Sequence, residues 1–248
     1  MTIRTAIVTG AARGIGAAIS ERLAQDGMQV AVLDLNERDC DAVVARITAA
    51  GGKAIAVGAD VSDPVAVELA VDRVAKELGE PTVLVNNAGI IRREDAIKFD
   101  EKDWDDVVDL NLKTVFFFAQ AAAKHFIAQG DGGKIINVAS MLSFQGGVRV
   151  PSYTASKSGV IGITRALANE WAGHRINVNA IAPGYMATNN TAALRADESR
   201  NSSILERIPA GRWGVPDDLA GPVVFLASRA SDYVNGYTVA VDGGWLAR

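Results

Sequence analysis

Short runs of apolar, mostly β-branched residues recur along the chain, and each is followed by a longer segment with apolar residues at helical spacing. The runs predict strands over residues 3–9, 29–34, 54–58, 83–86, 134–139, 175–181 and 237–241. The longer segments predict helices over residues 15–26, 39–50, 64–78, 101–129, 152–171 and 216–228. Because the strands are almost continuously apolar, we expect a parallel sheet buried on both faces. The pattern therefore predicts an α/β fold: a doubly wound parallel sheet of seven strands with helices on both faces.

No internal repeat, low-complexity tract or Pro/Ser-rich linker divides the sequence, so we expect a single domain over residues 1–248. The stretch 184–212, which follows the sixth predicted strand, is less regular and carries many charges, together with Asn189, Asn190 and Pro209. A polar excursion at the carboxyl edge of such a sheet favours a lid that covers a substrate. An ordinary surface insertion is the alternative.

A glycine-rich loop follows the first predicted strand, with the sequence T-G-A-A-R-G-I-G over residues 9–16. Glycine permits a tight turn and the close approach of a pyrophosphate, and the N-terminus of the following helix attracts an anion. The spacing differs from the usual G-x-G-x-x-G, and a turn without a ligand is the alternative. The position of the loop favours a Rossmann-type dinucleotide site. Its predicted residues are Gly10, Arg13, Gly14, Ile15 and Gly16.

Acidic residues follow the next two strands. Asp34, with Leu35 after it, ends the second strand, where a carboxylate can hydrogen-bond the adenosine ribose hydroxyls and repel a 2′-phosphate. This favours NAD over NADP, although Arg13 could pair with such a phosphate, and a solvated strand-end acid is the alternative. Asp60 and Val61, after the third strand, are predicted to flank the adenine, and Asp60 could equally cap the next helix.

Tyr153 and Lys157 are four residues apart in a predicted helix, so they lie on the same face. A phenol ordinarily titrates near pH 10, and a neighbouring ammonium brings its pKa toward the neutral range. Ser140 ends the fifth strand, at the sheet edge where ligands bind, and its hydroxyl can bond a substrate carbonyl. These three residues predict a proton-transfer centre.

Two further polar features lie between these motifs. Asn111 stands among apolar neighbours in the long fourth predicted helix, where a kink or a bound water would account for it and a surface amide is equally open. The N-N-A-G sequence at residues 86–89 follows the fourth strand. It either lines the cofactor, through Asn87, Ala88 and Gly89, or forms an ordinary loop.

Together these motifs resemble the short-chain dehydrogenase/reductase family. That family is marked by a T-G-x-x-x-G-I-G loop, an N-N-A-G turn, a helical Asn, a Ser and Y-x-x-x-K, and all are present here in that order. Pro183, Gly184 and Thr188 also match the family's segment beside the nicotinamide amide. The resemblance implies hydride transfer between a nicotinamide cofactor, here expected to be NAD, and a small-molecule substrate.

The resemblance also implies roles for the catalytic residues. Tyr153 would be the general acid in reduction and the general base in oxidation, while Ser140 would position and polarise the carbonyl. Lys157 would hold the nicotinamide ribose hydroxyls and lower the pKa of Tyr153, and Asn111 would anchor a water that relays protons to Lys157. Family members are commonly homotetramers, so we expect a homotetramer with the residues 116–118 either at an interface or in the core.

From about residue 86 onward, the stretches 91–96, 140–147, 149–153, 182–190 and 241–248 resemble family members that act on small sugar acids. The stretches 9–16 and 59–63 look more like the family's 3-oxoacyl-thioester reductases, which usually use NADPH. Such a reductase is the alternative function, and Asp34 and the mild acidity count against it.

A sugar acid carries a carboxylate, which an arginine can bind through two hydrogen bonds. Three arginines follow the motifs of the predicted site: Arg92, Arg93 and Arg149. Gln145 lies near the last of them in the sequence. We expect one arginine to grip the substrate carboxylate, and a solvated surface cation is the alternative for each.

Composition excludes several other classes. With 25 basic and 29 acidic residues and no basic stripe, the chain does not suit a nucleic acid or an anionic membrane. Its single cysteine, Cys40, cannot form an internal disulfide, which favours a reducing compartment, and we expect the cytoplasm. Its two histidines lie far apart, so we expect no metal site. A dinucleotide-binding regulator without catalysis is a further alternative, which the intact catalytic set disfavours.

Overall fold

The parallel sheet is present in a computed structural model of the protein, which describes residues 4–248. The seven strands form one sheet in the order β3-β2-β1-β4-β5-β6-β7, and every neighbouring pair is parallel. Their bounds are β1 Thr5–Thr9, β2 Gln29–Asp34, β3 Ala54–Gly58, β4 Pro81–Asn86, β5 Gly133–Val138, β6 Ile176–Pro183 and β7 Thr238–Val241. The predicted fold class is confirmed, with the second and third strands at their predicted bounds. Ile3, assigned to the first strand by its pattern, lies outside the described residues.

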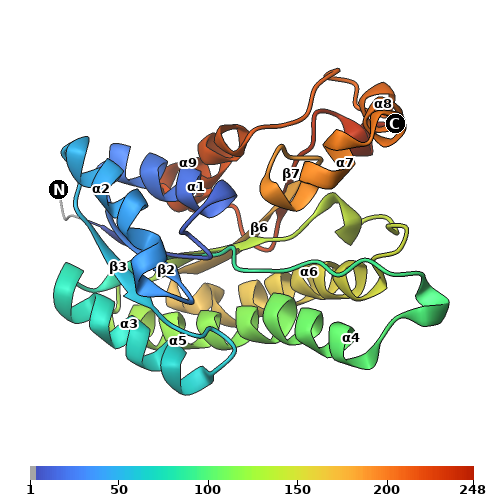
Figure 1. The fold of residues 1–248 in the computed structure, drawn as a ribbon. Helices are drawn as coiled ribbons and strands as arrows, with labels where there is room; N and C mark the ends of the chain where they lie inside the picture. Colours follow the sequence, from blue (N-terminus) through green and yellow to red (C-terminus); the bar gives the residue numbers. More distant parts are fainter. Residues whose placement is uncertain (1–3) are drawn as a thin grey trace.

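Helices cover both faces of the sheet (Figure 1), with α1, α2 and α9 on one side and α3, α5 and α6 on the other. Their bounds are α1 Gly14–Gln25, α2 Asp41–Ala49, α3 Pro64–Leu78, α4 Glu101–Val108, α5 Thr114–Gln129, α6 Pro151–Trp171, α7 Ala192–Ala196, α8 Glu198–Arg207 and α9 Ala220–Ala227. Within the described residues, no helix is both long and apolar enough to cross a membrane.

Two apolar cores lie back to back, one on each face of the sheet. Successive strand residues point to opposite faces, so in β1 the side chain of Ile7 joins one core while Ala6 and Val8 join the other. All three are fully buried. This double burial is why the strands read as continuous apolar runs in the sequence.

The predicted fourth helix, residues 101–129, is interrupted. A π-helical turn, Asp109–Lys113, joins α4 to α5 and places Asn111 at the junction. Extra residues in a helical turn commonly serve a functional side chain. The interruption therefore decides between the alternatives for Asn111: its amide is fully buried, so the surface reading is wrong.

The winding of the sheet changes direction between β1 and β4. After β3 at one edge, the chain crosses to β4, on the other side of β1, and then proceeds outward to β7. In open α/β sheets, ligands bind at such a switch point, beyond the carboxyl ends of the strands. The loops after β1, β2, β4, β5 and β6 all begin at this edge of the sheet.

Candidate active site

The loop after β1 forms a cradle that only glycine permits at two positions. Gly10 has a left-handed backbone, with φ of +61°, and a Cβ there would lie 2.8 Å from the Cα of Ala88. A Cβ on Gly16 would lie 2.4 Å from the carbonyl oxygen of Gly10. Arg13 then precedes α1 in an extended conformation without a side-chain cap. The first N–H groups of α1 are thus left for an anion, so the cradle fits a dinucleotide pyrophosphate.

The N-N-A-G turn after β4 is bonded to this cradle. The side chain of Asn87 donates to the carbonyl oxygens of Thr9, at 2.8 Å, and Gly10, at 3.0 Å. In return, the hydroxyl of Thr9 accepts from the backbone N–H groups of Asn87 and Ala88, each at 3.0 Å. The two motifs, almost eighty residues apart in sequence, therefore form one rigid unit at the switch point.

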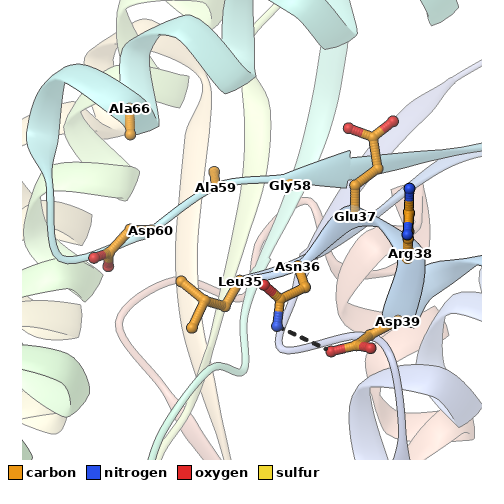
Figure 2. Close-up of a pocket in the computed structure, with 9 residues that line it drawn as sticks. All are labelled: Leu35, Asn36, Glu37, Arg38, Asp39, Gly58, Ala59, Asp60 and Ala66. Atoms are coloured by element: carbon orange, nitrogen blue, oxygen red, sulfur yellow. Dashed lines mark hydrogen bonds between the residues drawn. The ribbon is translucent and has the colours of Figure 1, made fainter.

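A pocket of about 720 Å³ opens beyond the carboxyl ends of β2 and β3 (Figure 2). We refer to it as the β2–β3 pocket; it is lined by residues 35–39, 58–60 and Ala66. Leu35 and Asp60, both predicted cofactor residues, are among its lining residues, and Val61 is buried beside it. Glu37, Arg38 and Asp39 were not singled out from the sequence, although they directly follow the strand-end acid.

Asp34 itself is turned toward the glycine loop. One carboxylate oxygen accepts from the backbone N–H of Ala12 at 3.0 Å, and the other accepts from the N–H of Leu35 at 2.9 Å. Both oxygens retain further lone pairs, so the group can still accept from a ribose hydroxyl. Its existing bonds fix the carboxylate at the carboxyl end of β2, directly before the pocket residue Leu35.

Ser140 and Tyr153 converge at the carboxyl end of β5. Ser140 begins the short turn Met141–Ser143, where its hydroxyl accepts from the N–H of Leu142 at 3.1 Å. Tyr153 lies in the first turn of α6, with its phenol close enough to the Ser140 side chain for that hydroxyl to lower its pKa. A reacting carbonyl oxygen placed between these hydroxyl groups would meet two hydrogen-bond donors.

Burial dominates the pKa values at this centre. Burial raises the pKa of Tyr153, while the hydrogen bond from Ser140 and the guanidinium of Arg93 act in the opposite direction. The predicted effect of Lys157 on this pKa stays a prediction. The Nζ of Lys157 lies 5.8 Å from the centre of the Tyr153 ring. Burial also lowers the pKa of Lys157 to about 8.

Lys157 and Asn111 meet around Gly89. The ammonium of Lys157 donates to the carbonyl oxygen of Val138 at 2.6 Å. The amide of Asn111 closes the loop at Ile90, because it accepts from the N–H and donates to the carbonyl oxygen of that residue, both at 2.8 Å. A Cβ on Gly89 would lie 3.0 Å from the Asn111 oxygen and 3.7 Å from the Lys157 nitrogen. The loop, the π-turn and α6 thus bring both residues to the switch point.

Ser143 is a supporting residue that sequence reasoning missed. Its hydroxyl accepts from the N–H of Ser140 at 3.2 Å and donates to the carbonyl oxygen of Lys157 at 2.7 Å. Ser143 therefore connects the end of β5 to the turn of α6 that carries Lys157. The spacing of two serines three residues apart, typical of a capping box, was the available signal.

The segment after β6 folds over the carboxyl edge. Pro183 ends β6, and Gly184 approaches β7 so closely that a Cβ would lie 2.6 Å from the Cα of Asp242. Thr188 then begins a short turn that leads into α7 and α8. Ile204 and Ile208 anchor the far end of this segment in a cluster with Trp245.

The predicted substrate residues have different partners. Arg92 pairs with Asp103 at 3.2 Å, and Arg149 pairs with Asp95 at 3.0 Å. Arg93 instead donates to the carbonyl oxygen of Asn190, at 3.2 Å. The oxygen of the Gln145 side chain accepts from Arg207, at 3.2 Å, a contact that the sequence did not indicate.

A family model described as enoyl-(acyl carrier protein) reductase matches residues 10–246 of the chain. The protein belongs to the short-chain dehydrogenase/reductase family. It is an oxidoreductase of that family. The 2-dehydro-3-deoxy-D-gluconate 5-dehydrogenase of Escherichia coli is 62% identical over 245 residues, which cover 99% of this chain and 96% of that protein. This similarity spans the first 85 residues too, so the resemblance to sugar-acid enzymes does not begin at residue 86.

Two solved structures share the fold and carry a cofactor. A protein from Agrobacterium tumefaciens, described as a 2-deoxy-D-gluconate 3-dehydrogenase with bound NADP, has a TM-score of 0.93 and 55% identity. The match covers 99% of this chain and 97% of that one. The gluconate 5-dehydrogenase of Burkholderia cenocepacia, in complex with NADP and tartrate, has a TM-score of 0.96 and 39% identity, with coverage of 100% and 97%. A nicotinamide dinucleotide is therefore the cofactor class of this family member.

Proposed function

We propose that this protein is a 2-dehydro-3-deoxy-D-gluconate 5-dehydrogenase that uses NAD. The observation that carries the proposal is the 62% identity to the Escherichia coli enzyme, which extends over nearly the whole of both chains. The convergence of Ser140, Tyr153 and Lys157 beside the glycine cradle supports it. Asp34, fixed at the carboxyl end of β2, supports NAD rather than NADP.

The proposed chemistry assigns one task to each residue. Bound nicotinamide supplies or accepts the hydride. In reduction, Ser140 holds the carbonyl oxygen and Tyr153 donates a proton to it as negative charge develops; in oxidation, Tyr153 takes that proton from the alcohol. Lys157 holds the nicotinamide ribose, and its ammonium, freed from Val138, stabilises the tyrosinate. Asn111 holds the Ile90 loop and the proton-relay water.

We assign the substrate carboxylate to Arg93. Among the three predicted arginines, Arg92 and Arg149 already pair with acidic side chains, whereas the bond described for Arg93 is to a neutral carbonyl oxygen. A carboxylate forms a stronger bond with guanidinium than a carbonyl does, so it would displace Asn190. The assignment is supported by the electrostatic effect of Arg93, which acts to lower the pKa of Tyr153.

Arg93→Gln should raise KM for the sugar-acid ketone about tenfold or more, because a charge-assisted pair is lost, while kcat changes less. Arg149→Gln is the matched control, since this arginine is occupied by Asp95, and it should leave KM within about twofold. Steady-state kinetics with the purified variants provide the measurement. An unchanged KM in Arg93→Gln, or an increase only in Arg149→Gln, contradicts the assignment.

Initial rates with NADH and NADPH test the function directly. The purified protein is offered the 5-keto form of 3-deoxy-gluconate and, separately, acetoacetyl-coenzyme A. Rapid NADH oxidation with the sugar acid alone is the expected result. Turnover of the thioester with NADPH instead would favour the 3-oxoacyl-thioester reductase, in line with the description of the matching family model. No turnover of any ketone would favour a non-catalytic dinucleotide-binding protein.

A homotetramer in the cytoplasm is the proposed working form. A groove of about 220 Å³ between α5 and α6, lined by Phe116, Ile127 and Trp171 among others, supports an interface there. Phe118, in contrast, is buried in the core. Light scattering coupled to gel filtration should give four times the chain mass of 26.0 kDa, and a monomeric mass would contradict the proposal.

A further inference from the structure

Arg73, on the outer face of α3, forms ion pairs with two glutamates. Its guanidinium binds Glu37 through two hydrogen bonds, of 2.9 and 3.1 Å, and its Nε donates to Glu77 at 2.9 Å. A bidentate pair within a network of three charges holds its geometry better than an isolated surface pair. The bonds to Arg73 also hold the pKa of Glu37 below its usual range.

Glu37 is a lining residue of the β2–β3 pocket, whereas Arg73 is not. The backbone of Glu37 packs against Gly58, where a Cβ would lie 3.0 Å from the Glu37 Cβ. Its carboxylate points away from Leu35 and Asp60 (Figure 2), because Arg73 binds it from α3. The Glu37 carboxylate is thus paired with a cation and turned away from the interior of the pocket.

The other charges around the pocket make this pair decisive. Asp34 is bonded to the N–H groups of Ala12 and Leu35, and Asp39 accepts from the side chain of Asn36 at 3.3 Å. Asp60, a third acid, accepts from the N–H and the hydroxyl of Ser62, at 2.9 and 2.7 Å. Arg38, also in the lining, has no ion pair within residues 4–248. If Glu37 were released, its negative charge would offset the positive charge of Arg38. The pocket would then attract the 2′-phosphate of a bound adenosine less strongly.

We propose that Arg73 is a specificity-determining positioning residue, which keeps Glu37 out of the β2–β3 pocket and so permits binding of a 2′-phosphorylated dinucleotide beside NAD. The proposal rests on the proposed dinucleotide function. It predicts that this protein binds NADPH measurably, although more weakly than NADH because Asp34 still disfavours the 2′-phosphate. It also predicts that the ratio of the two affinities depends on a residue that touches neither cofactor.

Equilibrium binding of NADH and NADPH, followed by nicotinamide fluorescence, tests the proposal without catalysis. Arg73→Gln should weaken NADPH about fivefold to tenfold and NADH less than twofold, since only the former carries a 2′-phosphate. Adding Glu37→Gln should restore the NADPH affinity, and Arg73→Lys should largely preserve it. Calorimetry with adenosine 2′,5′-bisphosphate and with AMP should give the same contrast.

Arg46→Gln is the matched control. This arginine pairs with Glu21 at 2.7 Å between α2 and α1, outside the pocket lining, so its loss should leave both affinities unchanged. Equal weakening of NADH and NADPH in Arg73→Gln, or no restoration by Glu37→Gln, would mean that Arg73 is only structural and would overturn the inference.

The wild-type protein separates this inference from the proposed function. Binding of NADH without measurable binding of NADPH overturns the inference and leaves the proposed function intact. Normal binding of both cofactors without turnover of the sugar acid overturns the proposed function alone. If Arg73→Gln does not fold, Arg73→Lys and Glu37→Arg take its place; the latter should strengthen NADPH binding, and an unchanged affinity would overturn the inference.

Discussion

The catalytic centre and the β2–β3 pocket lie at the same edge of the sheet but are built differently. At the centre, Asn111, Ser140 and Lys157 are buried, and each bonds to backbone groups. Around the pocket, by contrast, Glu37 and Asp39 are exposed and bond mainly to other side chains. Backbone bonds between buried elements fix geometry, whereas exposed side-chain pairs are weak and adjustable. The fold thus holds the residues proposed for the chemistry rigidly, whereas the side-chain pairs proposed to influence cofactor choice can change more easily.

Tyr153→Phe should give the largest effect, because it removes the only proton donor and acceptor proposed for the reaction. We expect kcat to fall by at least about a thousandfold, with the fold retained. Tyr233→Phe, at a fully exposed ring, is the control and should behave like the wild type. A small decrease in kcat for Tyr153→Phe would mean that the catalytic centre tolerates substitution as well as the β2–β3 pocket does.

Gly16→Ala tests the cradle that both regions share. The added Cβ would lie 2.4 Å from the Gly10 oxygen and 2.6 Å from the Asn87 amide, so the loop must shift. We expect NADH affinity to fall by about a hundredfold or more, measured by fluorescence titration. Gly162→Ala in α6, with nothing within 4 Å, should leave binding unchanged and stabilise the helix by about 0.5–1 kcal/mol. Unaltered binding in Gly16→Ala would remove the cradle from the cofactor site.

Comparison of the wild type with Lys157→Met measures how much the burial of a charged lysine lowers the free energy of unfolding. In the folded protein the pKa of Lys157 is lowered from 10.5 to about 8. Below pH 8 the lysine is therefore charged in both the folded and the unfolded chain, and burial of the charge destabilises the fold to its full extent. Above pH 8 the folded chain loses the proton first, and the cost is relieved as the pH rises toward 10.5. The wild type should therefore gain about 2 kcal/mol relative to Lys157→Met between about pH 7.5 and pH 10.

Urea denaturation of both proteins at each pH provides this measurement, and the comparison cancels groups that the two proteins share. A difference that does not change with pH would show that Lys157 titrates as it does in the unfolded chain. The variant should also lose activity below about pH 8, where the wild type has the cation beside Tyr153 and the variant does not.

Asn36→Ala should give the smallest effect. It removes an exposed bond of 3.3 Å to Asp39 at the pocket rim. We expect the free energy of unfolding to change by less than about 0.5 kcal/mol and the Kd for NADH by less than about threefold. A loss of binding comparable to that in Gly16→Ala would mean that the pocket wall is as rigid as the catalytic centre.

The sequence predicted the parts of the site that depend on local spacing. Tyr153 and Lys157 share one face of α6 because the helical repeat requires it, and the glycine cradle follows from residues adjacent in sequence. It did not predict which arginine is paired with an acid, since Asp103 and Asp95 reach Arg92 and Arg149 only when separate loops meet. It also gave no sign that burial raises the pKa of Tyr153, because burial depends on elements that pack around the ring only in the folded chain.

The sequence by itself predicted the seven parallel strands, the burial of the central strands on both faces and the side chains that we propose take part in the reaction. A strand that is buried on both faces needs a continuous apolar run, whatever its position in the sheet. Such a run can be recognised from neighbouring residues in the sequence alone. Only the tertiary structure decided that Asn111 closes the Ile90 loop from a π-turn and that Arg73 binds Glu37 from another helix. Hydrogen bonds, ion pairs and desolvation depend on distances between elements far apart in the chain, and those distances exist only once the sheet has assembled.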